Sequence, residues 1–337
     1  MKKVLFISTV SSMFRLPIWR AFEECGYEVH IIDYRDHPFL EVGNIFHRVL
    51  HRLPKKLGNY LHSWGNKSVD SSILKKAYEI KPDLIFAHKA KYIDVSVLDK
   101  LRTITPTANW YPETTNNIAT INRIVGHYDY FFEFDKSIVE LLKAKGHKNV
   151  YYLPFCGDMS KNEEWKPTSD EYDVVFIGSY IKELYPQRLA ILNQIKDLGL
   201  NVWGNENWLD TPIKDVFHGR CKATTEVLKS IYSKAKIVIN MDALITHTST
   251  GLTMRPFDVA SAGSLLISQD DRSELFDFFE DGKEVVSFHD EHDIRSKVEY
   301  YLSHDEERRR IAKAGFERTK RDNTYLDRIK YVIDIVR

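Results

Sequence analysis

The first 33 residues, MKKVLFISTVSSMFRLPIWRAFEECGYEVHIID, decide the fold class. Residues 4–7 are a short apolar run that stops at polar residues, as a buried strand does. Residues 16–25 follow with a helical pattern that Gly26 ends, and residues 28–33 form a second strand. A strand, a helix and a strand in this order make a βαβ unit, which predicts a parallel sheet.

The same alternation continues along the chain and predicts two α/β halves in tandem. The first half has further strands at 84–87, 107–112, 128–133 and 150–153, and helices at 73–80 and 137–145. A polar stretch without apolar periodicity, 159–171, is the expected linker. The second half has strands at 173–177, 200–203, 237–239 and 264–267, helices at 188–198, 227–233 and 257–262, and a closing amphipathic helix at 324–337.

Composition excludes several classes of protein. The 337 residues suggest about two domains. With 48 basic and 48 acidic residues the chain has no net charge, so nucleic acid is not expected as a partner. Three cysteines without CxxC spacing support neither a disulfide framework nor a zinc site. The first apolar run is too short for a signal peptide, and no run approaches the ~18 apolar residues of a membrane span, so we expect a cytoplasmic protein.

Two doubly wound domains that face each other enclose a central cleft at the carboxyl ends of both sheets, where open α/β sheets bind ligands. The loop that leads into the helix at 257–262 carries Thr250, Gly251 and Leu252. Free amides at a helix start form an anion site, and Arg255 adds a guanidinium suited to phosphate. Asp258, one turn further, is placed to accept hydrogen bonds from ribose hydroxyls. Together these residues outline a nucleotide diphosphate pocket; the alternative is a capped helix with a surface salt bridge between Arg255 and Asp258.

The second half resembles GT-B glycosyltransferases of the group 1 type, with a C-terminal domain similar to that of the spore maturation protein CgeB. The matching segments are 173–179 (DVVFIGS), Arg188, 236–240 (KIVIN), 255–258 (RPFD), 262–263 (AG), 274–276 (ELF) and 279–282 (FEDG). The resemblance implies two Rossmann-like domains, 1–158 for the acceptor and 172–318 for a nucleotide sugar, with 319–337 packing back on the first. It also implies sugar transfer without a metal.

Two positions depart from the pattern of the retaining relatives. Asp258 stands where they carry the glutamate that contacts ribose, and Thr250 stands eight residues upstream in place of a carboxylate. The resemblance therefore leaves the stereochemical outcome open. An epimerase of the same architecture, or a non-catalytic sugar-nucleotide-binding partner protein, are the two alternatives to a transferase.

Transfer with inversion needs a base in the first domain to deprotonate the acceptor hydroxyl. Glu113 is the first candidate and His88, at the end of a strand, the second; either residue type more often only makes hydrogen bonds in a loop. Gly178, Ser179 and Arg188 follow the first strand of the second half and are expected near the phosphates, although Arg188 is equally compatible with a structural role. Trp208 and Tyr185, on predicted cleft loops, could stack on a base or sugar.

Two charged segments have competing interpretations. Residues 46–64 form a basic amphipathic stretch that either associates weakly with a membrane surface or packs as a surface helix on the first sheet. Asp270 and Asp271 are more consistent with a solvated loop than with a metal site, so no metal is expected. The acceptor is a glycan, a protein or another hydroxyl compound, and the sequence does not discriminate among them.

Overall fold

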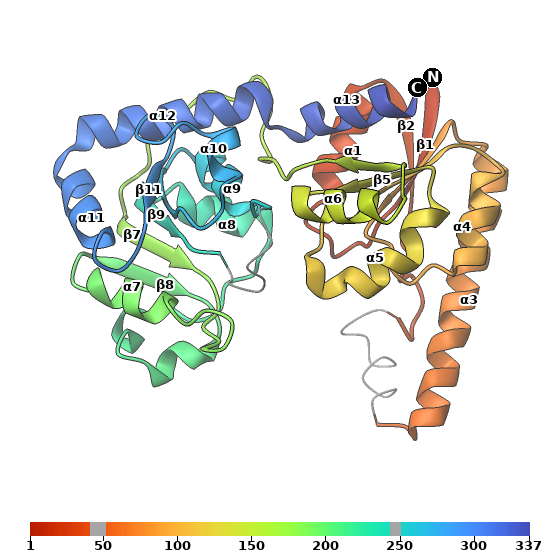
Figure 1. Ribbon diagram of the computed structural model, residues 1–337, viewed down its shortest axis with the longest axis horizontal. Helices are drawn as coiled ribbons and strands as arrows, with labels where there is room; N and C mark the ends of the chain where they lie inside the picture. The colour runs from red at the N-terminus through yellow and green to blue at the C-terminus, as the bar shows by residue number, and fades with distance from the viewer. Residues whose placement is uncertain (41–51, 243–250) are drawn as a thin grey trace. The chain divides into compact units, whose positions relative to one another are not determined.

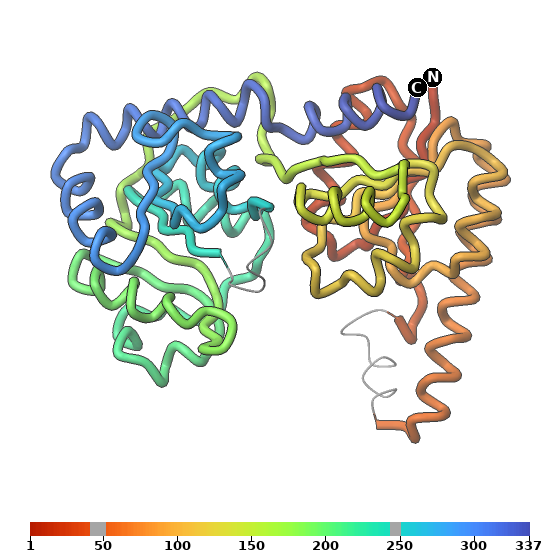
Figure 2. The backbone as a smooth tube through the Cα atoms, in the orientation of Figure 1, coloured from red at the N-terminus to blue at the C-terminus, as the bar shows by residue number. Residues whose placement is uncertain are grey.

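The computed structural model of the chain describes residues 1–40, 52–242 and 251–337. These residues divide into two compact units (Figures 1 and 2). Unit 1 comprises Met1–Pro154 and Arg328–Arg337, and unit 2 comprises Phe155–Asp327. Within the described ranges, no helix combines the length and apolar character needed to cross a bilayer.

Unit 1 is built on a six-stranded sheet in the order β2-β1-β3-β4-β5-β6, with every pair parallel. Its strands are β1 (Lys2–Ile7), β2 (Tyr27–Ile32), β3 (Leu84–His88), β4 (Thr107–Trp110), β5 (Tyr130–Glu133) and β6 (Val150–Tyr152). Its helices are α1 (Arg15–Glu24), α3 (Lys55–Ile80), α4 (Val95–Arg102), α5 (Ile118–Ile124) and α6 (Lys136–Ala144). The opening βαβ unit is confirmed, and Gly26 adopts the expected left-handed conformation with φ of 83°.

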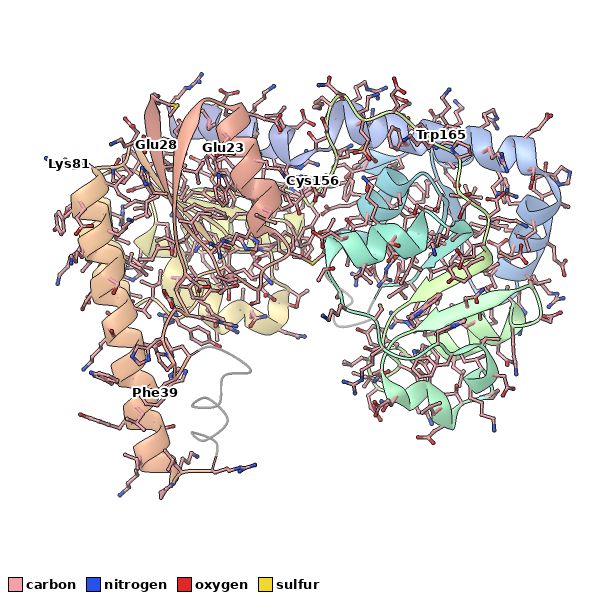
Figure 3. The ribbon with its side chains drawn as sticks, turned by 180° about the vertical axis from the view of Figure 1, so that it is seen from behind. Glu23, Glu28, Phe39, Lys81, Cys156 and Trp165 are labelled. Atoms are coloured by element: carbon pink, nitrogen blue, oxygen red, sulfur yellow. The ribbon has the colours of Figure 1, made fainter. Side chains whose placement is uncertain are left out.

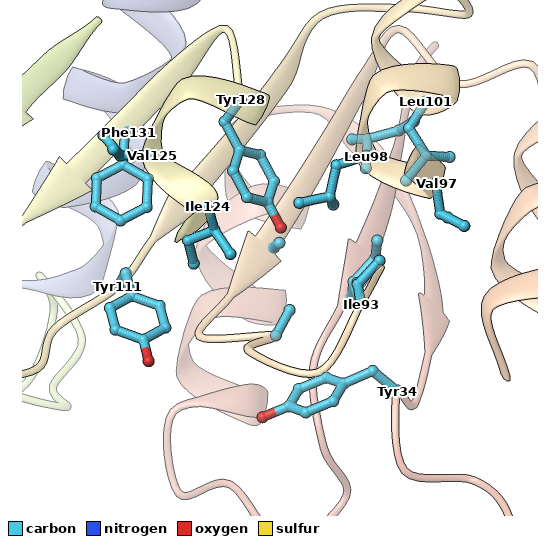
Figure 4. Close-up of a cluster of buried hydrophobic side chains, with 14 of the residues drawn as sticks. Tyr34, Ile93, Val97, Leu98, Leu101, Tyr111, Ile124, Val125, Tyr128 and Phe131 are labelled. Carbon is cyan, nitrogen blue, oxygen red and sulfur yellow. The ribbon is translucent and has the colours of Figure 1, made fainter. Parts of the chain in front are cut away.

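The core of unit 1 lies between this sheet and its helices. Strand residues such as Leu5 and Ile85 and helix residues such as Leu98 are excluded from solvent. Figure 4 shows part of this cluster, in which Tyr111, Tyr128 and Phe131 lie beside aliphatic side chains. The continuous apolar strands predicted from the sequence are buried on both faces, as helices on either side of a parallel sheet require.

The helix predicted at 73–80 is only the last part of α3, which runs unbroken from Lys55 and passes through Gly58. Its buried residues begin at Gly65 and end at Ala77. The interpretation of the basic stretch as a helix packed on the sheet is therefore wrong for residues 55–64, none of which is buried. Residues 46–51 of that stretch lie outside the described residues.

Unit 2 has a five-stranded sheet in the order β11-β10-β9-β7-β8, again parallel throughout. The strands are β7 (Tyr172–Ile177), β8 (Leu200–Trp203), β9 (Ala235–Asn240), β10 (Leu265–Gln269) and β11 (Val286–Phe288). The helices are α7 (Arg188–Gln194), α8 (Thr225–Tyr232), α9 (Arg255–Ala262), α10 (Leu275–Phe278), α11 (Ile294–Ser303) and α12 (Asp305–Asp322). Because all strands run the same way, the loops after β7, β9 and β10 meet at one edge of this sheet.

The last helix, α13 (Tyr325–Val336), begins in unit 2 and ends in unit 1. Arg328 donates from Nε to the Pro154 carbonyl at 3.0 Å. The Tyr331 ring lies 6.5 Å from that of Phe132 on β5. Residues from the far end of the sequence thus contribute to the packing of unit 1.

Candidate functional site

Two guanidinium groups lie against one aromatic ring at the carboxyl end of the unit 2 sheet. The Cζ atoms of Arg188 and Arg255 are 5.1 and 5.8 Å from the ring centroid of Phe176, on β7. Burial, and then the nearby charge of Arg255, lower the pKa of Arg188 to about 10. Arg188 stays protonated at neutral pH, so the site holds two neighbouring positive charges.

The terminal nitrogens of Arg188 donate hydrogen bonds to main-chain carbonyls. It donates to the carbonyl of Ser179 at 2.5 Å and to that of Met241 at 2.8 Å. Its guanidinium also stacks on the Tyr185 ring at 3.5 Å. The residue is 4% exposed, and its contacts fasten the loop after β7 to the loop after β9. These contacts support the structural alternative for Arg188, as a residue that positions Ser179.

Gly178 is packed so tightly that a side chain would not fit. A Cβ atom there would lie 2.8 Å from the Phe176 ring and 3.3 Å from Nη1 of Arg188. Its carbonyl accepts a hydrogen bond from Nε1 of Trp208 at 2.8 Å. Trp208 is fully buried, so the prediction that it stacks on a ligand is wrong. The close approach of the Phe176 ring explains the glycine.

Arg255 is the first residue of α9 and is only partly buried. It donates from Nη1 to Oδ1 of Asn240 at 3.1 Å, and Asn240 donates in turn to the Ser268 hydroxyl at 3.0 Å. This chain of contacts joins the ends of β9 and β10 to the helix start. Gly251 and Leu252, just before the helix, are buried, and the predicted Thr250 lies outside the described residues. The helix N-terminus and a guanidinium therefore share one site, as an anion-binding position requires.

Asp258 lies in the first turn of α9 and is 8% exposed. Burial raises its pKa to about 8, and Asp158 adds to this effect, whereas Arg255 and Lys229 oppose it. No ion pair joins Arg255 to Asp258, and Asp258 is not on the surface. The alternative of a surface salt bridge is therefore wrong. The structure brings Ser179, Arg188, Arg255 and Asp258 to one region of unit 2, with Gly178 and Gly251 in the same loops.

Two buried carboxylates in this region were not predicted as site residues. Asp242 accepts from the Thr253 hydroxyl at 2.8 Å through Oδ1, while its Oδ2 is buried without a hydrogen bond. Both carboxylate oxygens of Asp271 are likewise buried without a partner in the described structure. Burial and the charge of Asp242 raise the pKa of Asp271 to about 7. The prediction that Asp271 lies in a solvated loop is therefore wrong. The neighbouring Asp270 has its Oδ1 3.1 Å from Nδ1 of His289.

A signal for this pair was present in the sequence. Asp242 and Asp271 each stand two residues beyond the end of a strand, β9 and β10 respectively. Those strands are neighbours in the sheet. Carboxyl ends of adjacent parallel strands meet at one edge, so side chains placed there come together.

In unit 1, His88 is the last residue of β3 and is 2% exposed. Its ring centroid lies 4.6 Å from that of Phe14 and 5.9 Å from that of Trp110. Burial, assisted by the Lys89 charge, lowers its pKa to about 3, so the imidazole is neutral at physiological pH. Its Nε2 is buried without a hydrogen bond within the described ranges. The ring forms part of an aromatic cluster.

Glu113 follows β4 and is held by two neighbours. Lys89 Nζ lies 2.7 Å from Oε1, and Asn117 Nδ2 donates to Oε2 at 2.9 Å. Lys89 and Ala90 are both non-glycine residues in the left-handed region, with φ of 62° and 48°. Such conformations cost free energy and recur at functional sites. Lys89, which sequence reasoning missed, thus reaches Glu113 from a strained turn after β3.

Glu133, the last residue of β5, is a further acidic group at this edge of the sheet. It is completely buried; Oε1 accepts from the Phe134 amide at 2.9 Å and Oε2 makes no hydrogen bond of ordinary geometry. Burial raises its pKa well above the usual value, and the charges of Asp135 and Glu113 act in the same direction. Burial therefore favours the uncharged form of Glu133. Its position at the end of an apolar strand was the signal that could have identified it.

Comparisons with known proteins identify the fold. Residues 187–334 match the family model described as glycosyl transferase-like. Over 100% of this chain and 99% of the other, the structure is similar to Anabaena HepE in complex with UDP-glucose, with a TM-score of 0.62 at 11% identity. Sucrose-phosphate synthase from Thermosynechococcus elongatus superposes with a TM-score of 0.67 at 11% identity, over 99% and 98% of the chains. This is the GT-B fold.

A putative UDP-N-acetylglucosamine 2-epimerase from Listeria monocytogenes is also similar, with a TM-score of 0.57 at 12% identity over 99% and 96% of the chains. No match was found among curated proteins. At such identities the likeness shows the GT-B fold alone. The glycosyl transferase-like segment includes Arg188, Arg255 and Asp258, whereas Gly178 and Ser179 precede it.

Proposed function

We propose that the protein is a glycosyltransferase that moves a sugar from a nucleotide diphosphate sugar to an acceptor hydroxyl. The observation that carries the proposal is the pair of guanidinium groups at Phe176, one from the start of α7 and one from the start of α9, both inside the glycosyl transferase-like segment. Neither Arg188 nor Arg255 has an ion-pair partner among the described residues. A diphosphate would complete the charge balance of this site.

Each donor-binding residue has a distinct role in this proposal. Arg255 and the amides at the start of α9, with Gly251 and Leu252, hold the diphosphate. Arg188 fixes the Ser179 loop against it rather than binding phosphate directly, because its terminal nitrogens already donate to carbonyls. Asp258 accepts a hydrogen bond from a ribose hydroxyl. Thr250 is expected to belong to the loop before α9.

The leaving nucleotide is stabilised without a metal in this mechanism. As the bond between the anomeric carbon and the phosphate oxygen breaks, negative charge develops on the diphosphate. Arg255 and the N-terminus of α9 are positioned to stabilise that charge. The donor site therefore supplies positive charge through side chains and main-chain amides.

Glu113 is the proposed base on the acceptor side. It removes the proton from the acceptor hydroxyl as the acceptor oxygen bonds to the anomeric carbon, which gives inversion at that carbon. Lys89 and Asn117 orient its carboxylate. His88 is the weaker candidate, because its ring is enclosed by Phe14 and Trp110. The acceptor is a glycan, a protein or another hydroxyl compound.

Thermal-shift measurements with UDP, GDP, ADP, CMP and their sugar conjugates test the donor site. A bound nucleotide raises the melting temperature by mass action, and HepE, solved with UDP-glucose, makes uridine nucleotides the first choice. No shift with any nucleotide would contradict the proposal. Interconversion of a sugar nucleotide without any acceptor would instead identify an epimerase, the activity after which the Listeria protein of the same fold is named.

A further inference from the structure

The first part of α3 makes few packing contacts in the described structure: its ring contacts there are those of Trp64 with His37 and Phe39 and of His62 with Tyr92. The helix is 26 residues long, yet none of residues 55–64 is buried. Figure 1 shows this half extending away from the unit 1 sheet, while the second half lies against the body of the unit. Isolated helical turns gain stability mainly by packing an amphipathic face, so a helix projecting this far implies a surface that covers it.

The projecting half carries an apolar stripe at helical spacing. Leu57, Tyr60, Leu61 and Trp64 follow the i, i+3, i+4, i+7 pattern; we call these four residues the α3 face. Leu57 is 45% exposed, Tyr60 68% and Trp64 53%. Of these four, Trp64 has aromatic neighbours among the described residues, with His37 at 5.0 Å and Phe39 at 6.1 Å between ring centroids. Figure 3 shows Phe39 beside this helix.

The charges around the α3 face are of one sign. Residues 52–69 contain Arg52, Lys55, Lys56 and Lys67 and no acidic residue, in a chain whose net charge is zero. None of these four cations forms an ion pair within the described ranges. The first acidic residue that follows, Asp70, is buried and accepts from the Asp94 amide at 3.4 Å. Among the described residues, the positive charge at this end of α3 is therefore balanced only by the attraction between Lys67 and Asp94.

This combination fits a bilayer better than it fits a protein. Tyrosine and tryptophan are favoured at the headgroup level, and lysine side chains extend from an apolar face to reach phosphates. The stripe runs over eight residues, about 10 Å along the helix axis from Leu57 to Trp64, and its four side chains are far fewer than the roughly 20–30 residues that each partner contributes to a standard protein interface. We propose that the α3 face and its flanking cations bind the surface of an anionic lipid bilayer.

Flotation of the full-length protein with vesicles tests the proposal. Vesicles of phosphatidylcholine alone are compared with vesicles that also contain phosphatidylglycerol. Each basic residue near such a surface changes affinity roughly fivefold, so Lys55→Glu with Lys56→Glu should weaken binding at least about 25-fold. Leu57→Ser with Tyr60→Ser should also abolish flotation. The wild type should float only with the anionic vesicles, and less at high salt.

The same helix provides the control. Lys75→Glu with Lys76→Glu changes the charge equally at the packed end of α3 and should leave flotation unchanged, as should Leu141→Ser, another exposed leucine on α6. Equal loss in these controls, or no flotation of the wild type, would overturn the proposal. So would displacement by free glycerol phosphate, which would indicate a headgroup pocket, or a dimer that Leu57→Ser with Tyr60→Ser dissociates. Nucleotide thermal shifts of the variants stay at wild-type values, which separates this proposal from the donor site.

Discussion

Arg188 and Arg255 direct their guanidinium groups at the same phenylalanine, Phe176, from the starts of two different helices. Like charges held this close repel, and the repulsion contributes to the lowered pKa of Arg188. Arg188 is tied to two carbonyls, so Arg255 is the group left to contact an anion. In the proposed donor site, Arg188 is therefore the positioning residue and Arg255 is the residue that binds the anion.

Arg255→Ala should weaken nucleotide binding by about 10- to 100-fold, since a hydrogen bond to a charged group contributes roughly 1.5–3 kcal/mol. Arg255→Lys should restore only part of the affinity because a lysine cannot bind phosphate in bidentate fashion. Calorimetric titration with UDP measures both. Arg220→Ala, which removes an exposed arginine of unit 2, should bind as the wild type does. Undiminished affinity in Arg255→Ala would refute the assignment.

Glu113→Gln should lower the rate of sugar transfer by about 10²–10⁴-fold while nucleotide affinity stays unchanged, because the amide cannot accept the proton. Lys89→Met should lower the rate less, since the base remains but loses one of its two orienting contacts. Initial rates at saturating donor and acceptor measure both effects. Glu140→Gln on α6, which is exposed, serves as the control. Full activity in Glu113→Gln would move the role of base to another residue.

Because of Asp258, the free energy of unfolding should fall as the pH rises, which is the opposite of the usual effect of a carboxylate. Its pKa is about 8 in the folded protein and ~4 when unfolded, so the folded state holds the proton more tightly. Ionisation therefore destabilises the fold progressively as pH rises from about 4 to above 8. Asp258→Asn should melt close to the wild type at pH 5 and several degrees higher at pH 9. Asp215→Asn, at an exposed carboxylate, should show no such divergence.

The same carboxylate should influence ligand binding. Ribose hydroxyls donate hydrogen bonds more effectively to an ionised carboxylate than to a protonated one. If Asp258 contacts the ribose, nucleotide affinity should rise as pH increases through about 8. Titration with UDP from pH 6 to 9 measures this. Asp258→Asn should remove the dependence, and a persistent dependence in that variant would assign it to another group.

Glu133→Gln should fold as the wild type does, because the amide fills the same buried space and burial favours an uncharged group at this position. Glu133→Ala should lose about 2 kcal/mol or more of the free energy of unfolding through the cavity it leaves. Urea unfolding distinguishes the two substitutions. A strong destabilisation by Glu133→Gln would instead show that the ionised form is present in the fold.

The sequence by itself determined the parallel α/β architecture in two halves. Apolar runs such as residues 4–7 and 173–177 are local patterns, and the glycines that end helices act within one turn. Both signals can therefore be recognised from the sequence alone. The order of residues also placed Glu113, Arg255 and Asp258 just after strands or at a helix start. Parallel strands put such positions at one edge of a sheet, whatever the details of packing.

Only the tertiary structure decided which side chains are withdrawn from water and which are paired. Trp208 and Asp271 stand in polar stretches of sequence, yet neighbouring strands and loops enclose them. Lys89 meets Glu113 across 24 residues because β3 and β4 pair. Desolvation and charge pairing depend on these long-range contacts, which no local spacing encodes. They shift the pKa values of His88, Glu133 and Asp258.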